Sequence, residues 1–110
     1  MTVLSTLETL CDRILAQKSV LAEPLSRDTI FLDILLESVD SLAYTFLLAP
    51  FLYNTQDCVQ HLSMLVCDII KAIDQHESKR PVQAEFLKDA QDCLATLGRN
   101  LLSQEAAMSV

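Results

Sequence analysis

Apolar residues recur along this chain at steps of three and four positions, a spacing that gathers side chains on one face of an α-helix. Four such stripes follow one another. They comprise Val3, Leu4, Leu7, Leu10, Cys11, Ile14 and Leu15; Phe31, Leu35, Val39, Leu42 and Phe46, with Ile34 and Ala43 at the margins; Cys58, Val59, Leu62, Leu65, Val66, Ile69 and Ile73; and Phe86, Leu87, Ala90, Cys93, Leu94, Leu97 and Leu101. No stretch shows the strict alternation of a half-buried β-strand. The pattern therefore predicts four amphipathic helices and no sheet.

Residues that typically start and stop helices lie between the stripes. Pro24 disfavours a helical conformation at the residue before it, so we place the first connection there. Asp28 and Asn54 are good N-caps for the second and third helices, because their side chains accept hydrogen bonds from free backbone N–H groups. Pro50 marks the predicted end of the second helix. Pro81 suits the first position of the fourth helix, where a missing N–H group loses no hydrogen bond.

The length of the chain and its short connections limit the fold. A chain of 110 residues supports one hydrophobic core, so we predict a single domain over residues 1–110. Short connections between successive helices imply antiparallel neighbours. We therefore predict an all-α fold, a four-helix up-down-up-down bundle. The alternative is a pair of helical hairpins that completes its core by dimerisation.

The charge of the chain excludes several classes of partner. Lys and Arg number 8 and Asp and Glu 15, so the formal charge is −7 and a phosphate backbone is repelled. The whole excess of negative charge falls on residues 28–77. No segment approaches the roughly 20 continuous apolar residues that cross a bilayer. We expect neither a nucleic-acid nor a membrane partner.

The cysteines indicate a reducing compartment. The four of them lie far apart inside helical patterns, unlike the dense disulfide framework of a small secreted fold. Charged residues interrupt the apolar ones in residues 1–16, so we expect no signal peptide there. We interpret the chain as a cytoplasmic protein with free thiols.

Few side chains suit catalysis or metal binding. Asp57, His61 and Asp68 fall along one edge of the third helix, and we interpret them as a solvated edge with a weak ion pair. The only glycine, Gly98, lies inside a helical stripe and forms no phosphate-binding loop. We therefore predict no enzymatic activity, no cofactor and no metal site.

Two motifs resemble those of carrier proteins. Asp40-Ser41-Leu42 is similar to the Asp-Ser-Leu motif of acyl carrier proteins, whose serine carries a phosphopantetheine arm. His61 resembles the exposed helical histidine of histidine-phosphotransfer bundles. The chain departs from both patterns: Ser41 lies within an apolar stripe instead of opening a helix, and the family's lysine and glycine do not follow His61. A carrier protein using Ser41 or His61 is the alternative function that these resemblances imply.

The remaining signal is apolar surface beyond the needs of one core. In residues 44–53 only Thr45 is neither apolar nor aromatic, and a helix cannot bury all its faces against one core. We expect part of this segment to lie on the surface or in the turn after Pro50, beside an apolar outer face of the third helix. The predicted docking residues are Tyr44, Leu48, Phe51, Leu52, Tyr53, Met64 and Cys67.

These observations predict a non-catalytic interaction module, an adaptor or an oligomerising bundle. Its partner is another protein or a second copy of the chain, and a homo-oligomer is expected. Acidic residues on the same two helices favour a basic amphipathic partner. The alternative is that residues 44–53 fold over the end of the bundle and close it.

Overall fold

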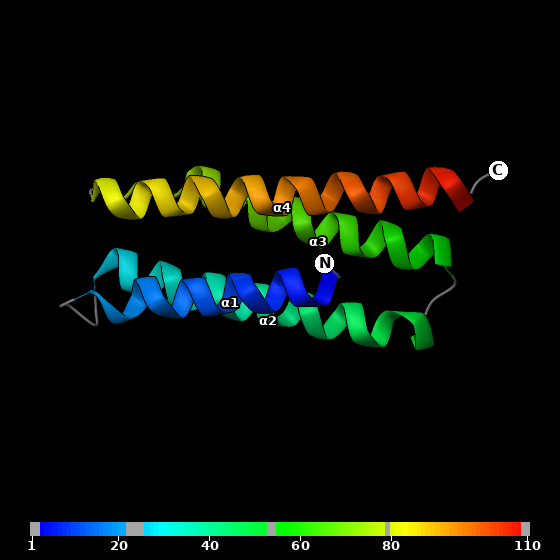
Figure 1. The fold of residues 1–110 in the computed structure, drawn as a ribbon, viewed down its shortest axis with the longest axis horizontal. Helices are drawn as coiled ribbons and strands as arrows, with labels where there is room; N and C mark the ends of the chain where they lie inside the picture. The colour runs from blue at the N-terminus through cyan, green and yellow to red at the C-terminus, as the bar shows by residue number, and fades with distance from the viewer. Residues whose placement is uncertain (1–2, 22–25, 53–54, 79, 109–110) are drawn as a thin grey trace.

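The computed structural model consists of four α-helices arranged in two layers (Figure 1). It describes residues 3–21, 26–52, 55–78 and 80–108, and the side chains of 3–21, 26–48, 57, 59–78 and 80–101. The helices are α1 (Val3–Ser19), α2 (Arg27–Leu52), α3 (Thr55–Gln75) and α4 (Pro81–Met108). No β-strand occurs in the described ranges. The predicted all-α class with four helices is confirmed.

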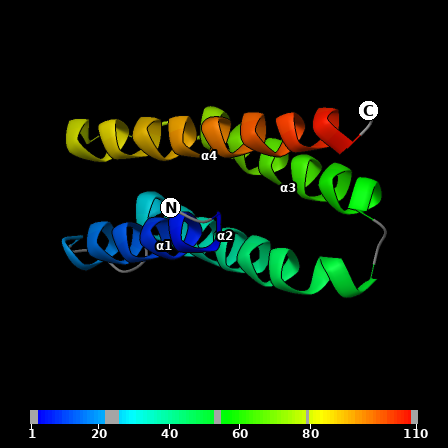
Figure 2. The ribbon, with the colours of Figure 1, turned by 45° about the vertical axis from the view of Figure 1, so that its right-hand side comes forward.

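The two layers are pairs of helices that follow each other in the chain. α1 packs against α2 and α3 against α4, and both views show these pairs lying one above the other (Figures 1 and 2). Between the layers, α2 contacts α3, and α1 makes a smaller contact with α4. The seam between α2 and α3 is therefore one of the two places where the layers meet.

One hydrophobic core lies among the four helices, and all four predicted stripes contribute to it. Its buried apolar side chains are Leu7, Leu10, Ile14, Leu32, Leu35, Val39, Leu42, Val59, Leu62, Val66, Ile69, Ile73, Phe86, Leu87, Ala90, Leu94, Leu97 and Leu101. Val3, Cys11 and Leu65 from the predicted stripes are partly buried at its edge, while Leu15 is exposed. The period of 3.6 residues therefore predicted the inward face of α1, α3 and α4.

The buried face of α2 keeps the predicted Leu35, Val39 and Leu42 but extends to Leu32 instead of Phe31 and Ile34. Leu32 is completely buried, whereas Phe31 is only partly buried and Ile34 is 53% exposed. α1 packs against α2, and Leu32 lies one turn before the buried Leu35 and two turns before the buried Val39. The predicted stripe left out Leu32 because it took the preceding Phe31 as the first inward residue of the helix.

Ser26, and not the predicted Asp28, caps α2. The Thr29 backbone N–H donates to Ser26 Oγ at 3.1 Å, which satisfies one of the free donors at the start of the helix. Asp28 instead lies in the first turn of α2. Its carboxylate accepts a hydrogen bond from His76, the residue that directly follows α3. The prediction of Asp28 as the N-cap is therefore wrong by two residues.

α2 continues through Pro50 to Leu52, so the predicted end at Pro50 is also wrong. Pro50 lacks the N–H that would donate to the Phe46 carbonyl, so the last turn of α2 has one backbone hydrogen bond fewer. Phe51 and Leu52 consequently belong to the last turn of α2 instead of a connecting turn. Pro81 opens α4 as predicted.

Candidate functional site

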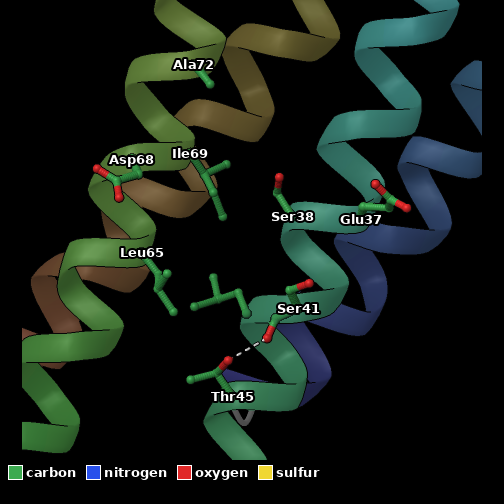
Figure 3. Close-up of a pocket in the computed structure, with 9 residues that line it drawn as sticks. Glu37, Ser38, Ser41, Thr45, Leu65, Asp68, Ile69 and Ala72 are labelled. Carbon is green, nitrogen blue, oxygen red and sulfur yellow. Dashed lines mark hydrogen bonds between the residues drawn. The ribbon is translucent and has the colours of Figure 1, made fainter.

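A groove of about 400 Å³ lies between α2 and α3 (Figure 3). α2 contributes Glu37, Ser38, Ser41, Leu42 and Thr45 to its lining. α3 contributes Leu65, Asp68, Ile69 and Ala72. We call this hollow the α2–α3 groove. Its volume lies within the roughly 300–1,000 Å³ range of sites that hold small molecules or side chains of a partner.

The floor of the α2–α3 groove is apolar. Leu42 and Ile69 are buried core residues, and Leu65 is half-buried beside them. Figure 3 shows the side chains of Leu65 and Ile69 extending from α3 towards α2. Any group that enters the groove therefore meets hydrocarbon at its base.

Small side chains on α2 leave the hollow open. Ile34, Ser38, Ser41, Thr45 and Leu48 follow one another at alternate steps of four and three, so they share one side of the helix. The large residues stand at the two ends of this row and the small ones in the middle. Because no bulky side chain projects from the middle, the surface between α2 and α3 is hollowed there.

Two hydroxyl groups of the groove are already bonded to their own helix. Ser38 Oγ donates to the Ile34 carbonyl at 2.9 Å, and Thr45 Oγ1 donates to the Ser41 carbonyl at 2.8 Å. This back-bonding uses the hydroxyl hydrogens within α2. These two residues therefore offer the groove their carbon atoms and hydroxyl oxygens that can only accept hydrogen bonds.

Carboxylates flank the groove on both sides. Glu37 lies on the α2 side and Asp68 on the α3 side, and Figure 3 shows both acidic groups at the outer edges. Both side chains are exposed, and no basic group pairs with either among the side chains that the structure describes. The groove thus combines an apolar floor with two negatively charged edges.

Several predicted docking residues lie next to this groove. Tyr44 and Leu48 are exposed on α2, one and two turns beyond Ser41. Met64 is exposed on α3, one turn from Asp68, and Tyr44 and Met64 are 65% and 66% exposed. Leu47, which the sequence did not single out, is also exposed.

Other predicted docking residues lie elsewhere or outside the description. Cys67 is exposed on α3 but does not line the groove. The backbone of Phe51 and Leu52 is helical, while their side chains and the whole of Tyr53 fall outside the described residues. The predicted patch is therefore described only at Tyr44, Leu48, Met64 and Cys67.

The two candidate carrier residues lie in separate positions. Ser41 is exposed in the middle of α2 and lines the groove, so it does not open a helix. His61 is half-buried on α3. Among the described residues, no group of three or more His, Cys, Asp and Glu side chains could hold a metal ion.

The structure also shows a polar cluster that the sequence did not reveal. His76 Nε2 donates to Asp28 Oδ1 at 2.9 Å, and Ser78 Oγ lies 3.5 Å from Asp28 Oδ2. The imidazole stacks on the Phe31 ring, with centroids 3.9 Å apart and planes 7° from parallel. We call these four residues the His76 cluster. It ties the first turn of α2 to the chain that follows α3.

The cysteines differ in their environment, which makes their reactivity predictable. Burial, followed by the negative charges of Asp40, Asp12 and Glu8, raises the pKa of the Cys11 thiol. Cys67 is exposed. Because the thiolate is the reactive form, we expect iodoacetamide at neutral pH to modify Cys67 several-fold faster than Cys11.

Alkylation of Cys11 should accelerate as the pH rises, because a thiol with a raised pKa ionises only at more alkaline pH. Peptide mapping by mass spectrometry after timed quenching measures both rates. In denaturant the two cysteines should react at similar rates, which serves as the control. Equal rates in the folded protein would contradict the partial burial and the raised pKa of Cys11.

Within the described part of the chain, no helix is both long enough and apolar enough to cross a bilayer. Comparison of the chain with protein-family models, with curated proteins and with solved structures finds no match.

Proposed function

We propose that this protein is a non-catalytic interaction module that binds a partner protein, or a second copy of itself, on the outer side of α2 and α3. The observation that carries the proposal is the α2–α3 groove, an apolar hollow of about 400 Å³ with acidic edges. Exposed Tyr44, Leu48 and Met64 extend its apolar surface. Apolar surface of this kind, rimmed by polar groups, is typical of protein-binding sites.

In this proposal the chain is an up-down-up-down bundle that acts in the cytoplasm. The pairing of α1 with α2 and of α3 with α4 supports such a topology. Helices of this kind hold the two walls of a groove at a fixed separation, so the bundle provides a rigid frame for docking. Any assembly into an adaptor or a homo-oligomer would use the same outer faces.

Site-specific photo-crosslinking tests the proposed docking face. A photoreactive phenylalanine analogue is placed at Tyr44, Leu48 or Met64, and at Val82 as a matched exposed apolar position on α4. We expect a covalent adduct in the native cell from the first three positions, because a bound partner covers them. Its mass identifies either a second copy of the chain or another protein.

The absence of any crosslinked adduct at Tyr44, Leu48 and Met64 would overturn the proposal. Equal labelling from Val82 would do so as well, because it would show chance collision instead of a defined face.

A carrier protein is the second candidate function. The exposed Ser41 side chain favours it, because a modifying enzyme can reach that hydroxyl. Co-expression with a phosphopantetheinyl transferase, followed by intact-mass measurement, tests Ser41, and acid-labile phosphate tests His61. An unchanged mass and no such phosphate would eliminate this function.

A further inference from the structure

The partner chemistry follows from the shape and charge of the α2–α3 groove, and it rests on the docking function proposed above. From Glu37 to Thr45 the lining of α2 spans about 12 Å along its axis, at about 1.5 Å per residue. That length corresponds to roughly two turns of a helix laid along the groove. The groove therefore accommodates one or two large apolar side chains of a partner.

The walls of the groove favour a helical partner over an extended one. α2 and α3 are helices, so their backbone donors and acceptors are used internally and offer no sheet edge to a strand. A helix satisfies its own backbone and inserts side chains only, which is what an apolar hollow between two helices requires.

The position of the two carboxylates specifies where the positive charges of the partner lie. Glu37 and Asp68 stand at the outer edges of the two walls, with the apolar floor of Leu42 and Ile69 between them. A ligand helix therefore meets hydrocarbon along its midline and negative charge on both flanks. We propose that the groove binds an α-helix of a basic partner protein, with a narrow apolar stripe and Lys or Arg along both edges of that stripe.

A second copy of this chain matches the charge of the groove less well than a basic protein does. Its formal charge of −7 makes two copies repel each other. Of its own basic residues, Lys18 already pairs with Asp33 and Arg13 lies 3.9 Å from Asp89. The charge of the groove is complementary to a different, basic protein.

Two synthetic helical peptides of equal composition and net charge test the inference. In the first, lysines flank a leucine stripe on both edges; in the second, the same lysines lie on the opposite face and glutamines flank the stripe. We expect the full-length protein to bind the first peptide about five- to tenfold more tightly, as measured by fluorescence anisotropy. The reason is that the lysines of this peptide form ion pairs with Glu37 and Asp68 at the two edges of the groove. This preference should shrink at high salt, because exposed charges are screened.

Two matched double variants test whether the preference for the first peptide arises from the carboxylates of the groove. The double change Glu37→Gln and Asp68→Asn should abolish the preference for the edge-flanked peptide, since it removes both charges and keeps the shape. The double change Glu85→Gln and Asp92→Asn removes two exposed carboxylates from α4 and should leave the preference intact.

The outcomes separate this inference from the docking function. Equal affinity for the two peptides, or a preference that survives removal of Glu37 and Asp68, overturns the edge pattern. If neither peptide binds while Tyr44, Leu48 and Met64 still crosslink to a partner, the basic helix is wrong and the docking function stands. If peptides and crosslinks both fail, the docking function fails with it.

Discussion

Replacement of His76 with alanine should lower the free energy of unfolding by about 2–4 kcal/mol, through loss of a ring stack and of a hydrogen bond to a carboxylate. The side chains of His76 and Asp28 are only 9% and 15% exposed, so water does not readily replace the lost donor. The Asp28 carboxylate would retain the distant Ser78 hydroxyl, and the Phe31 ring would lose its covering imidazole. Chemical denaturation monitored by circular dichroism measures the change.

Neighbouring variants separate the contributions to this loss. Gln75→Ala changes an exposed residue at the end of α3 and should alter the free energy of unfolding by less than about 0.5 kcal/mol. His76→Phe retains an aromatic ring against Phe31 but removes the donor to Asp28, so its cost measures the hydrogen bond more directly. A stability of His76→Ala equal to that of Gln75→Ala would show that the cluster does not tie α2 to the end of α3.

The His76 cluster illustrates what a sequence pattern cannot provide. His76 lies in the polar segment after the third stripe, and Asp28 looked like an ordinary N-cap. The two residues are 48 positions apart and meet only because α2 and α3 pack side by side. Periodicity reports which face of one helix is apolar, and it carries no information about which helix ends adjoin.

The helices themselves were predictable because burial and helical period are physically linked. A residue that must face the core recurs every three or four positions, so Leu62, Val66, Ile69 and Ile73 in α3 follow directly from the sequence. Helix ends were less predictable. Ser26 and Asp28 are both suitable N-caps by residue type, and only the backbone geometry decides between them.

The groove was also beyond the reach of sequence analysis, although part of its signal is visible. The row from Ile34 to Leu48 is small in the middle, which indicates a hollow on one side of α2. Whether a hollow remains there depends on how closely α3 approaches α2. It also depends on how much of the space between the two helices the side chains of Leu65, Ile69 and Ala72 occupy. The sequence predicted the exposed Tyr44, Leu48 and Met64 but not the groove that they border.

The face of α2 that points inward can be tested with two aliphatic residues of equal size. Leu32→Ala should lower the free energy of unfolding by about 2–5 kcal/mol, because Leu32 is completely buried and its removal leaves a cavity. Ile34→Ala removes a side chain that is 53% exposed, and its cost should stay below about 1 kcal/mol. Both variants end in alanine on the same helix, and the helix propensities of Leu and Ile differ by only a few tenths of a kcal/mol, so the difference between the two costs mainly reports burial. Denaturant midpoints at a common slope give the two values. A larger loss for Ile34 than for Leu32 would mean that α2 is turned about its axis and presents a different face to the core.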